Sequence, residues 1–151
     1  MPTAAQSIEI KAPVERVFDV VTDFASYPKF LPDMEEVEVL ESGERSAKVS
    51  FTTRLIKRVN YILAFDLKRP RGATWKLAGG DGVVKKNTGA WRFKKLGANL
   101  TELEFSADME LGIWMPSSVV GALISSHLPS MLECFKKRAE RKTVKRTTKK
   151  S

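Results

Sequence analysis

The stretch YPKFLPDMEEVEVLE, residues Tyr27 to Glu41, joins a predicted amphipathic helix to the first long strand of the chain. Pro28 and Pro32 allow at most one further helical turn, because a proline inside a helix removes a hydrogen bond and clashes with the preceding turn. Directly afterwards, VEVL alternates apolar and polar residues, as a half-buried strand does. The stretch therefore predicts a stiff, apolar connector that ends a helix and begins a sheet.

The residues before this connector predict one strand and one helix. SIEIK, residues 7–11, alternates as a half-buried strand does. Pro13 fits the first position of a helix, where its missing N–H costs nothing. The apolar residues from Val14 to Val21 recur at helical spacing and form one face.

The residues after the connector alternate with a period of two over several runs. Residues 47–55 and 59–67 place their apolar side chains on one face, and the short IKR link between them predicts a hairpin. ATWKLAG, GAWRFKKL and LTELEFSADMEL continue the pattern, separated by turn sequences. AGGDG lacks the Lys-Ser/Thr of a phosphate-binding loop and is expected to be one of these turns. The pattern predicts consecutive antiparallel strands.

The last predicted element is a long helix over residues 117–140, with Ser117 as its expected N-cap. Its apolar residues form one stripe, and Pro129 is expected to kink it or to leave one carbonyl unpaired. This is the only predicted element long enough to cover the apolar face of the sheet. We therefore expect an α+β fold. A curved antiparallel sheet of about six to seven strands wraps around the C-terminal helix, with a short helical segment after the first strand.

The charge of the chain is concentrated at its C-terminus. The 151 residues carry a formal net charge of +8, and residues 136–151 alone contain nine Lys or Arg and one acidic residue. We therefore predict one domain over residues 1–140 and a disordered basic tail over residues 141–151.

The chain shows neither a signal-peptide pattern nor a run of 18 apolar residues, and we expect a cytoplasmic protein.

Residues suited to catalysis or metal binding are scarce. His127 is the single histidine, so we expect no metal site and assign no catalytic residue or cofactor. His127 could serve as a proton donor or anchor in a pocket, although a surface or satisfied helix position is the simpler interpretation. Cys134 is the single cysteine, which excludes an internal disulfide, and it is expected to be buried and inert.

The aromatic residues of the strands fall on the apolar phase and face a single helix, which predicts an apolar cavity with a few polar groups, as small-molecule sites have. The predicted lining consists of Phe51, Thr53, Tyr61, Leu63, Phe65, Trp75, Trp91, Phe93, Phe105, Ile124, His127, Leu128 and Met131.

The order of SIEIKAPVERVFDVVTDFASYPKFLP, VEVLE, GAWRF and a final helix resembles the polyketide cyclase/dehydrase and lipid-transport family of the START-like, helix-grip (SRPBCC) superfamily. The YPxFLP…VLE pattern is similar to its branch of coenzyme-Q-binding proteins and ribosome-association toxins. The resemblance covers about residues 5–140. That branch often carries a Trp-Cys or Gly-Cys pair after FLP, where this chain has Asp33-Met34.

The resemblance implies that the connector forms a rigid plug at the cavity mouth, with a plain helix-to-strand connection as the alternative. The residues expected at the mouth are Tyr27, Phe30, Leu31, Trp114 and Met115. The implied function is a carrier or chaperone for a hydrophobic molecule such as a lipid, an isoprenoid quinone or a polyketide-like compound.

Two alternatives remain open at this point. One is an aromatase/cyclase-type enzyme, for which His127, Tyr61 and Arg54 are the available acid–base candidates. The other is an interaction protein whose basic tail contacts RNA, the ribosome or an anionic membrane.

Overall fold

The structure is a computed structural model that describes residues 3–54, 58–112, 116, 118–119 and 128–141. Its labelled elements are β1 (Thr3–Ile10), α1 (Val14–Val21), the 3₁₀ helix η1 (Phe24–Lys29), β2 (Met34–Ser42), β3 (Ser46–Arg54), β4 (Arg58–Lys68), β5 (Gly72–Gly80), β6 (Val84–Gly97) and β7 (Leu100–Leu111). Residues 128–141 form the C-terminal helix.

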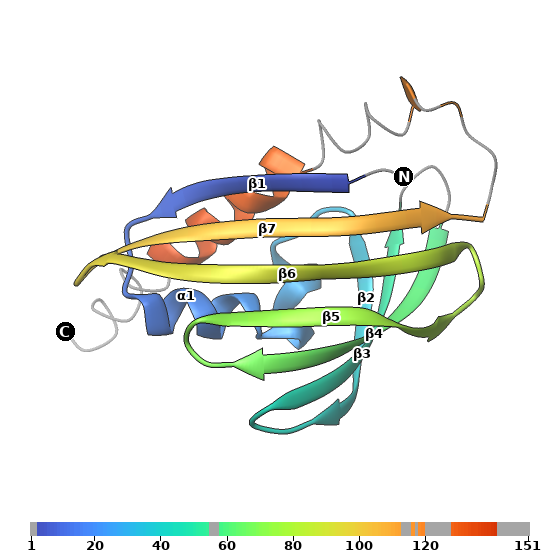
Figure 1. The fold of residues 1–151 in the computed structure, drawn as a ribbon, viewed down its shortest axis with the longest axis horizontal. Coiled ribbons are helices and arrows are strands. Elements are labelled where there is room, and N and C mark those ends of the chain that lie inside the picture. Colours follow the sequence, from blue (N-terminus) through green and yellow to red (C-terminus); the bar gives the residue numbers. More distant parts are fainter. Residues whose placement is uncertain (1–2, 55–57, 113–115, 117, 120–127, 142–151) are drawn as a thin grey trace.

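Within the described residues, the strands form one seven-stranded antiparallel sheet (Figure 1). Its order is β1-β7-β6-β5-β4-β3-β2, so the strands from β2 to β7 are consecutive neighbours and β1 closes the series against β7. The predicted hairpins are confirmed. β1 begins earlier than the sequence pattern indicated, because it pairs with β7 from Thr3 opposite Asp108 to Ile10 opposite Thr101.

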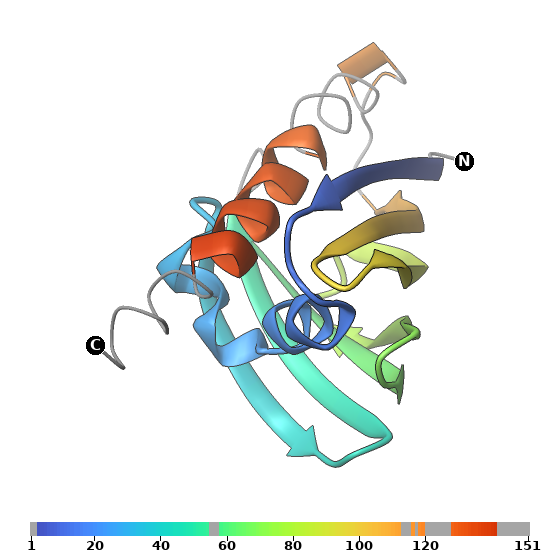
Figure 2. The same ribbon diagram turned by 90° about the vertical axis from the view of Figure 1, so that its left-hand side faces the viewer.

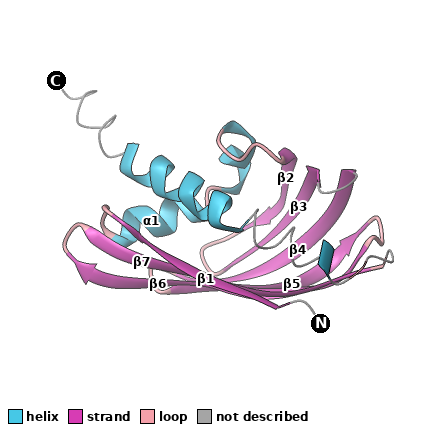
Figure 3. Cartoon of the chain, turned by 90° about the horizontal axis from the view of Figure 1, so that it is seen from above, coloured by secondary structure: helices cyan, strands magenta, loops and turns pink. Residues whose placement is uncertain are grey.

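The sheet is curved, and α1, η1 and the C-terminal helix all lie on its concave side (Figure 3). The C-terminal helix runs between β1 and η1 (Figure 2). Near its end, the Glu140 carboxylate accepts hydrogen bonds from the backbone N–H of Lys11 at 2.8 Å and from Lys136 Nζ at 2.6 Å. The predicted helix-grip α+β architecture is confirmed.

The concave face is shared between two helices, which corrects the expectation that one helix covers it alone. α1 buries Val14, Val17, Phe18, Val20 and Val21. The Phe18 ring packs edge-on against Phe93 of β6, with ring centroids 5.1 Å apart. One end of the concave face is therefore filled by α1, and the space beside the C-terminal helix lies at the other end.

Several sequence predictions fall outside the described residues. They are the N-cap at Ser117, residues 120–127 of the long helix, and the boundary between the domain and the tail beyond residue 141. Pro129 lies at the start of the described helical segment, so a kink there stays a prediction. Among the described residues, no helix has the length and apolar character that a membrane span requires.

Candidate binding cavity

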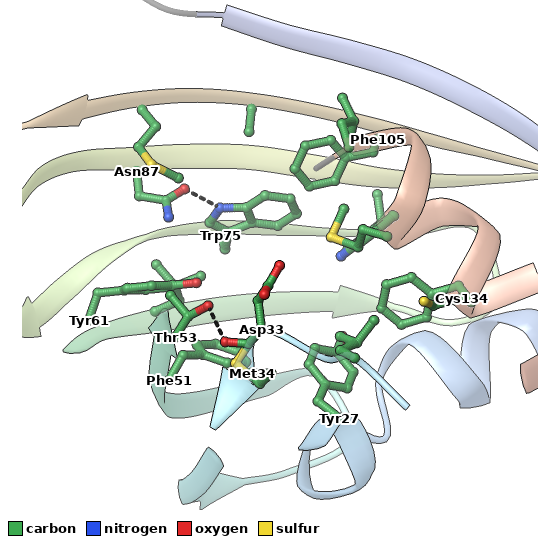
Figure 4. Close-up of a pocket in the computed structure, with 18 of the residues that line it drawn as sticks. Tyr27, Asp33, Met34, Phe51, Thr53, Tyr61, Trp75, Asn87, Phe105 and Cys134 are labelled. Carbon is green, nitrogen blue, oxygen red and sulfur yellow. Dashed lines mark hydrogen bonds between the residues drawn. The ribbon is translucent and has the colours of Figure 1, made fainter. Parts of the chain in front are cut away.

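A cavity of about 310 Å³ lies between the concave face of the sheet, the connector after η1 and the C-terminal helix (Figure 4). Its size is at the lower end of the range typical of small-molecule sites. Its lining is Tyr27, Leu31, Pro32, Asp33, Met34, Phe51, Thr53, Tyr61, Leu63, Phe65, Trp75, Asn87, Trp91, Phe105, Ala107, Met109, Leu111, Leu128, Ser130, Met131, Cys134 and Phe135.

Aromatic rings of the lining contact one another in a series that closes on itself. The members of this aromatic circuit, with the centroid distance to the next ring, are Tyr27 (5.9 Å), Phe51 (6.2 Å), Phe65 (5.8 Å), Trp75 (6.2 Å), Trp91 (5.3 Å) and Phe135 (5.4 Å, back to Tyr27). The circuit joins the sheet, the connector and the C-terminal helix. Because each aromatic pair contributes about 0.5–1.5 kcal/mol beyond its buried area, the rings hold one another in place. The apolar wall is thus formed before any ligand arrives.

The connector forms one wall of the cavity, and hydrogen bonds fix it at both ends. Tyr27 is buried, and its hydroxyl donates to the backbone carbonyl of Val21 at the end of α1. At the other end, the carbonyl of Asp33 accepts the Thr53 hydroxyl and the Arg54 backbone N–H, each at 2.9 Å. Pro28 within η1, Pro32 before β2 and these bonds give the segment from η1 to the start of β2 little freedom to move.

Trp75 is held in a defined orientation by two residues of the neighbouring strand. Gly89 stands directly opposite Trp75 in the β5–β6 ladder, and this is the last backbone pair between the two strands. The indole lies over Gly89 and donates its Nε1–H to Asn87 Oδ1 at 2.9 Å. An indole N–H can only donate, so the amide oxygen of Asn87 is identified and its nitrogen points the other way.

The hydroxyl groups of the two lining tyrosines remain protonated at neutral pH. Burial raises the pKa of Tyr61 to about 12 and raises that of Tyr27 well above its ordinary value. Burial also raises the pKa of the Cys134 thiol, with Glu133 and Asp33 adding to the effect and Lys137 opposing it. The two tyrosine hydroxyls are therefore hydrogen-bond donors, and the Cys134 thiol is a weak nucleophile. None of the three is suited to act as a base at pH 7.

Most of the residues predicted to line a cavity surround this one. Two that the structure describes do not. Phe93 is covered by Phe18 of α1, and Phe30 packs against Phe135 with Arg138 over its ring. Arg54, an acid–base candidate, is exposed and pairs with Glu35. Ile124, His127, Trp114 and Met115 lie outside the described residues.

Several lining residues escaped the sequence analysis, although a simple extension of its pattern finds some of them. Asn87, which lines the cavity, and Gly89, which lies under the Trp75 ring, share the phase of Trp91 on β6. This strand begins at Val84 and thus earlier than GAWRFKKL suggested. On β7, the phase of Phe105 continues through Ala107, Met109 and Leu111. Asp33 and Pro32 belong to the connector itself.

The chain is similar to proteins named as toxins. The ribosome association toxin RatA of Escherichia coli K12 is 26% identical over 151 residues, covering 93% of this chain and 88% of that protein. RatA of Pseudomonas aeruginosa is 24% identical, covering 85% and 88%.

Solved structures share the fold at lower identity. The Zhui aromatase/cyclase of Streptomyces sp. R1128 has a TM-score of 0.83 and 20% identity, covering 94% of this chain and 95% of that one. A STAR-related lipid transfer protein fragment from Xanthomonas axonopodis has a TM-score of 0.77 and 13% identity, covering 91% and 85%. The family model described as polyketide cyclase/dehydrase and lipid transport matches residues 10–136, more than half of the sequence. The chain therefore belongs to the polyketide cyclase/dehydrase and lipid transport family.

Proposed function

We propose that the protein binds a hydrophobic small molecule in this cavity and acts as its carrier or chaperone in the cytoplasm. The observation that carries the proposal is the cavity of about 310 Å³ with a lining dominated by aromatic and aliphatic side chains. A core made only for stability is close-packed and holds few voids larger than a water molecule. The preformed aromatic circuit supports the same conclusion, because it keeps this space open.

The hydrophobic effect is large enough to drive such binding. A ligand that buries roughly 400 Å² of apolar surface gains about 10 kcal/mol. Association costs remove about 4 kcal/mol or more. The remainder corresponds to a dissociation constant of about tens of micromolar, and a larger or better-fitting ligand would bind more tightly.

A fluorescence titration tests this function directly. Protein stripped of bound molecules by refolding is titrated with 2-propyl-6-dimethylaminonaphthalene, a neutral apolar fluorophore. We expect saturable binding with one site per chain and a rise in fluorescence anisotropy as the probe becomes immobilised in the cavity. Absence of saturable binding by a folded protein would contradict the proposal.

A second candidate function is association with the ribosome. It is favoured by the similarity to the RatA toxins over most of the chain and by the nine basic residues in 136–151. Sedimentation of the protein with ribosomes, compared between the full chain and a chain ending at Glu140, separates the two functions. Loss of cosedimentation in the shorter chain, with probe binding intact, would assign ribosome association to the tail and ligand binding to the cavity.

An aromatase/cyclase activity has less support. The likeness to the Zhui enzyme is a likeness of fold at 20% identity. Among the described lining residues, Tyr27, Tyr61 and Cys134 all have raised pKa values, and these make them poor bases at neutral pH. These three residues therefore supply no base at neutral pH, and the titratable group left in the described lining is Asp33.

A further inference from the structure

We infer that one end of the cavity is a hydrogen-bonding site for a neutral oxygen atom of the ligand, formed by the amide nitrogen of Asn87 and the hydroxyl of Tyr61. The ligand class that this site selects is an apolar body carrying an uncharged acceptor such as a carbonyl group. The inference rests on the proposed function, because it assumes that a hydrophobic molecule enters the cavity. Beyond that function, it states how the bound molecule is oriented and that Asn87 and Tyr61 determine this orientation.

Asn87 is a buried polar residue with donor capacity left over. The residue is 4% exposed, and its side-chain oxygen accepts the Trp75 indole N–H at 2.9 Å. No described residue accepts a hydrogen bond from its nitrogen. In the described structure, the side-chain polar atoms that lack both a partner and accessible surface are Arg16 Nε and Asp108 Oδ1. Asn87 Nδ2 is not one of them and therefore keeps accessible surface. Asn87 lines the cavity, and Figure 4 shows its amide nitrogen on the side of the pocket where Tyr61 lies.

Tyr61 supplies a second free donor at the same end. Its hydroxyl has no hydrogen-bond partner among the described residues, and its oxygen likewise keeps accessible surface. Figure 4 shows Asn87, Tyr61 and Thr53 gathered at one end of the drawn pocket, with Tyr27, Cys134 and Phe105 at the other. Donors left unpaired in an apolar enclosure are unfavourable, and an acceptor placed between them removes that cost.

Two other hydroxyl groups of the lining, those of Tyr27 and Thr53, are already engaged, which gives the site its direction. The Tyr27 hydroxyl donates to Val21 and the Thr53 hydroxyl to Asp33, in each case to a backbone carbonyl. Trp75 donates to Asn87. Among the strand residues of the described lining, the donors without a partner are therefore those of Asn87 and Tyr61, and a ligand oxygen is drawn toward this end.

The charge of the lining favours a neutral oxygen over a carboxylate. No Lys or Arg is among the described lining residues, and the acidic Asp33 lies on the cavity wall. A carboxylate would lose its hydration without gaining a positive partner, and an ion transferred into an apolar site without a partner is strongly disfavoured. A ketone, ester or similar carbonyl group needs only the two donors.

Three probes with the same aminonaphthalene body test this site. They carry, at position 2, a propionyl group (a neutral ketone), a propyl group (no acceptor) or a carboxylate, with dimethylamino at position 6. Dissociation constants are measured by fluorescence titration for the wild-type protein and for Tyr61→Phe, Asn87→Asp and Tyr27→Phe. Asn87→Asp keeps an oxygen to accept the Trp75 indole N–H and removes the amide donor.

We expect Tyr61→Phe and Asn87→Asp to weaken ketone binding roughly threefold to tenfold while propyl binding stays nearly constant, since one net hydrogen bond is lost. The emission of the bound ketone should also shift to shorter wavelength, because fewer donors contact its carbonyl. Tyr27→Phe, whose hydroxyl is engaged with Val21, should change the affinities for ketone and propyl probes by the same factor. The carboxylate should bind most weakly.

Equal effects of Tyr61→Phe and Asn87→Asp on the ketone and propyl probes, or tightest binding of the carboxylate, would overturn the inference while leaving the proposed function in place. Propyl binding by each variant shows that its cavity is intact, so a folding defect is not mistaken for a lost hydrogen bond. Failure of all three probes to bind the wild-type protein would overturn both.

Discussion

The indole of Trp75 lies so close over Gly89 that a Cβ atom added at Gly89 would stand 2.3 Å from Cζ2 of the ring. The same Cβ would stand 2.5 Å from the backbone carbonyl oxygen of Ser106 on the other neighbouring strand, which cannot move aside as a flexible side chain can. Gly89 therefore provides the space in which Trp75 crosses toward Asn87. The shape of the cavity wall depends on the absence of a side chain at this position.

Gly89→Ala is accordingly expected to destabilise the protein by about 1–3 kcal/mol, the usual cost of overpacking. In a chain of this size, the thermal midpoint should fall by several degrees. Gly97→Ala, on the same strand, is the matched control, because the nearest atom to its added Cβ is Leu100 Cβ at 3.9 Å. Thermal unfolding followed by circular dichroism would contradict this account if both variants melted with the wild-type protein.

The two lining tyrosines should respond differently to loss of the hydroxyl group. Tyr27→Phe leaves the carbonyl of Val21 without its donor and is expected to reduce the free energy of unfolding by about 1 kcal/mol. Tyr61→Phe removes a hydroxyl with no partner among the described residues and is expected to change it by less than about 0.5 kcal/mol. Urea unfolding of the two variants provides the comparison, and a larger loss in Tyr61→Phe would show that its hydroxyl is engaged in the free protein.

Alkaline pH should destabilise the wild-type protein more than Tyr61→Phe. The pKa of Tyr61 in the folded protein is about 12, above the ordinary value of 10.0. Its contribution to stability is therefore fully present below about pH 10 and is lost as the pH rises toward 12, because the unfolded chain ionises first. Between about pH 9 and about pH 11, the wild-type protein should lose roughly 1 kcal/mol more than the variant. Parallel pH profiles would show that burial of Tyr61 is incomplete.

The Glu140 carboxylate should stabilise the folded protein at neutral pH. Burial raises the pKa of Glu140, but the hydrogen bonds from Lys136 and from the Lys11 backbone outweigh it, so the net pKa is lowered. A lowered pKa stabilises the fold above the ordinary value of 4.5, and this contribution is lost as the pH falls through the folded-state value.

Glu140→Gln is therefore expected to reduce stability by roughly 1 kcal/mol at pH 7, with a smaller difference from wild type at about pH 3.

A chain ending at Glu140 should keep the wild-type thermal midpoint, because residues 141–151 contain Val144 as their only clearly apolar residue. A drop of many degrees on truncation would show that the tail packs against the domain.

The fold followed from the sequence because its two periodic patterns are strong. Alternation identified the strands and their inward faces, and the apolar stripe identified the C-terminal helix. What covers each part of the inward face could not be obtained in this way, since alternation gives the side of a residue and not its neighbour. Phe93 has the same phase as Trp91, yet α1 covers Phe93 and the cavity lies against Trp91.

Asn87 illustrates a second limit. It precedes Gly89 in a polar segment, KKNTG, that resembles a turn, and the backbone there pairs with β7 and no longer with β5. A polar residue in a segment paired on one side only gives little sign of being buried. Its role depends on the Trp75 indole, which comes from a different strand and is brought to it by the register of the sheet.

Native mass spectrometry of the protein purified from its own host tests the central claim most directly. Leu128→Trp places a larger side chain in the cavity, while Leu132→Trp, one turn further along the same helix, makes the same change at a buried position outside the lining. We predict that the wild-type protein carries a hydrophobic molecule at one copy per chain. Leu128→Trp should lose it with little loss of stability, and Leu132→Trp should retain it while losing about 1–3 kcal/mol. A wild-type mass equal to that of the bare chain, or equal retention of the molecule by Leu128→Trp, would contradict a binding function for this cavity.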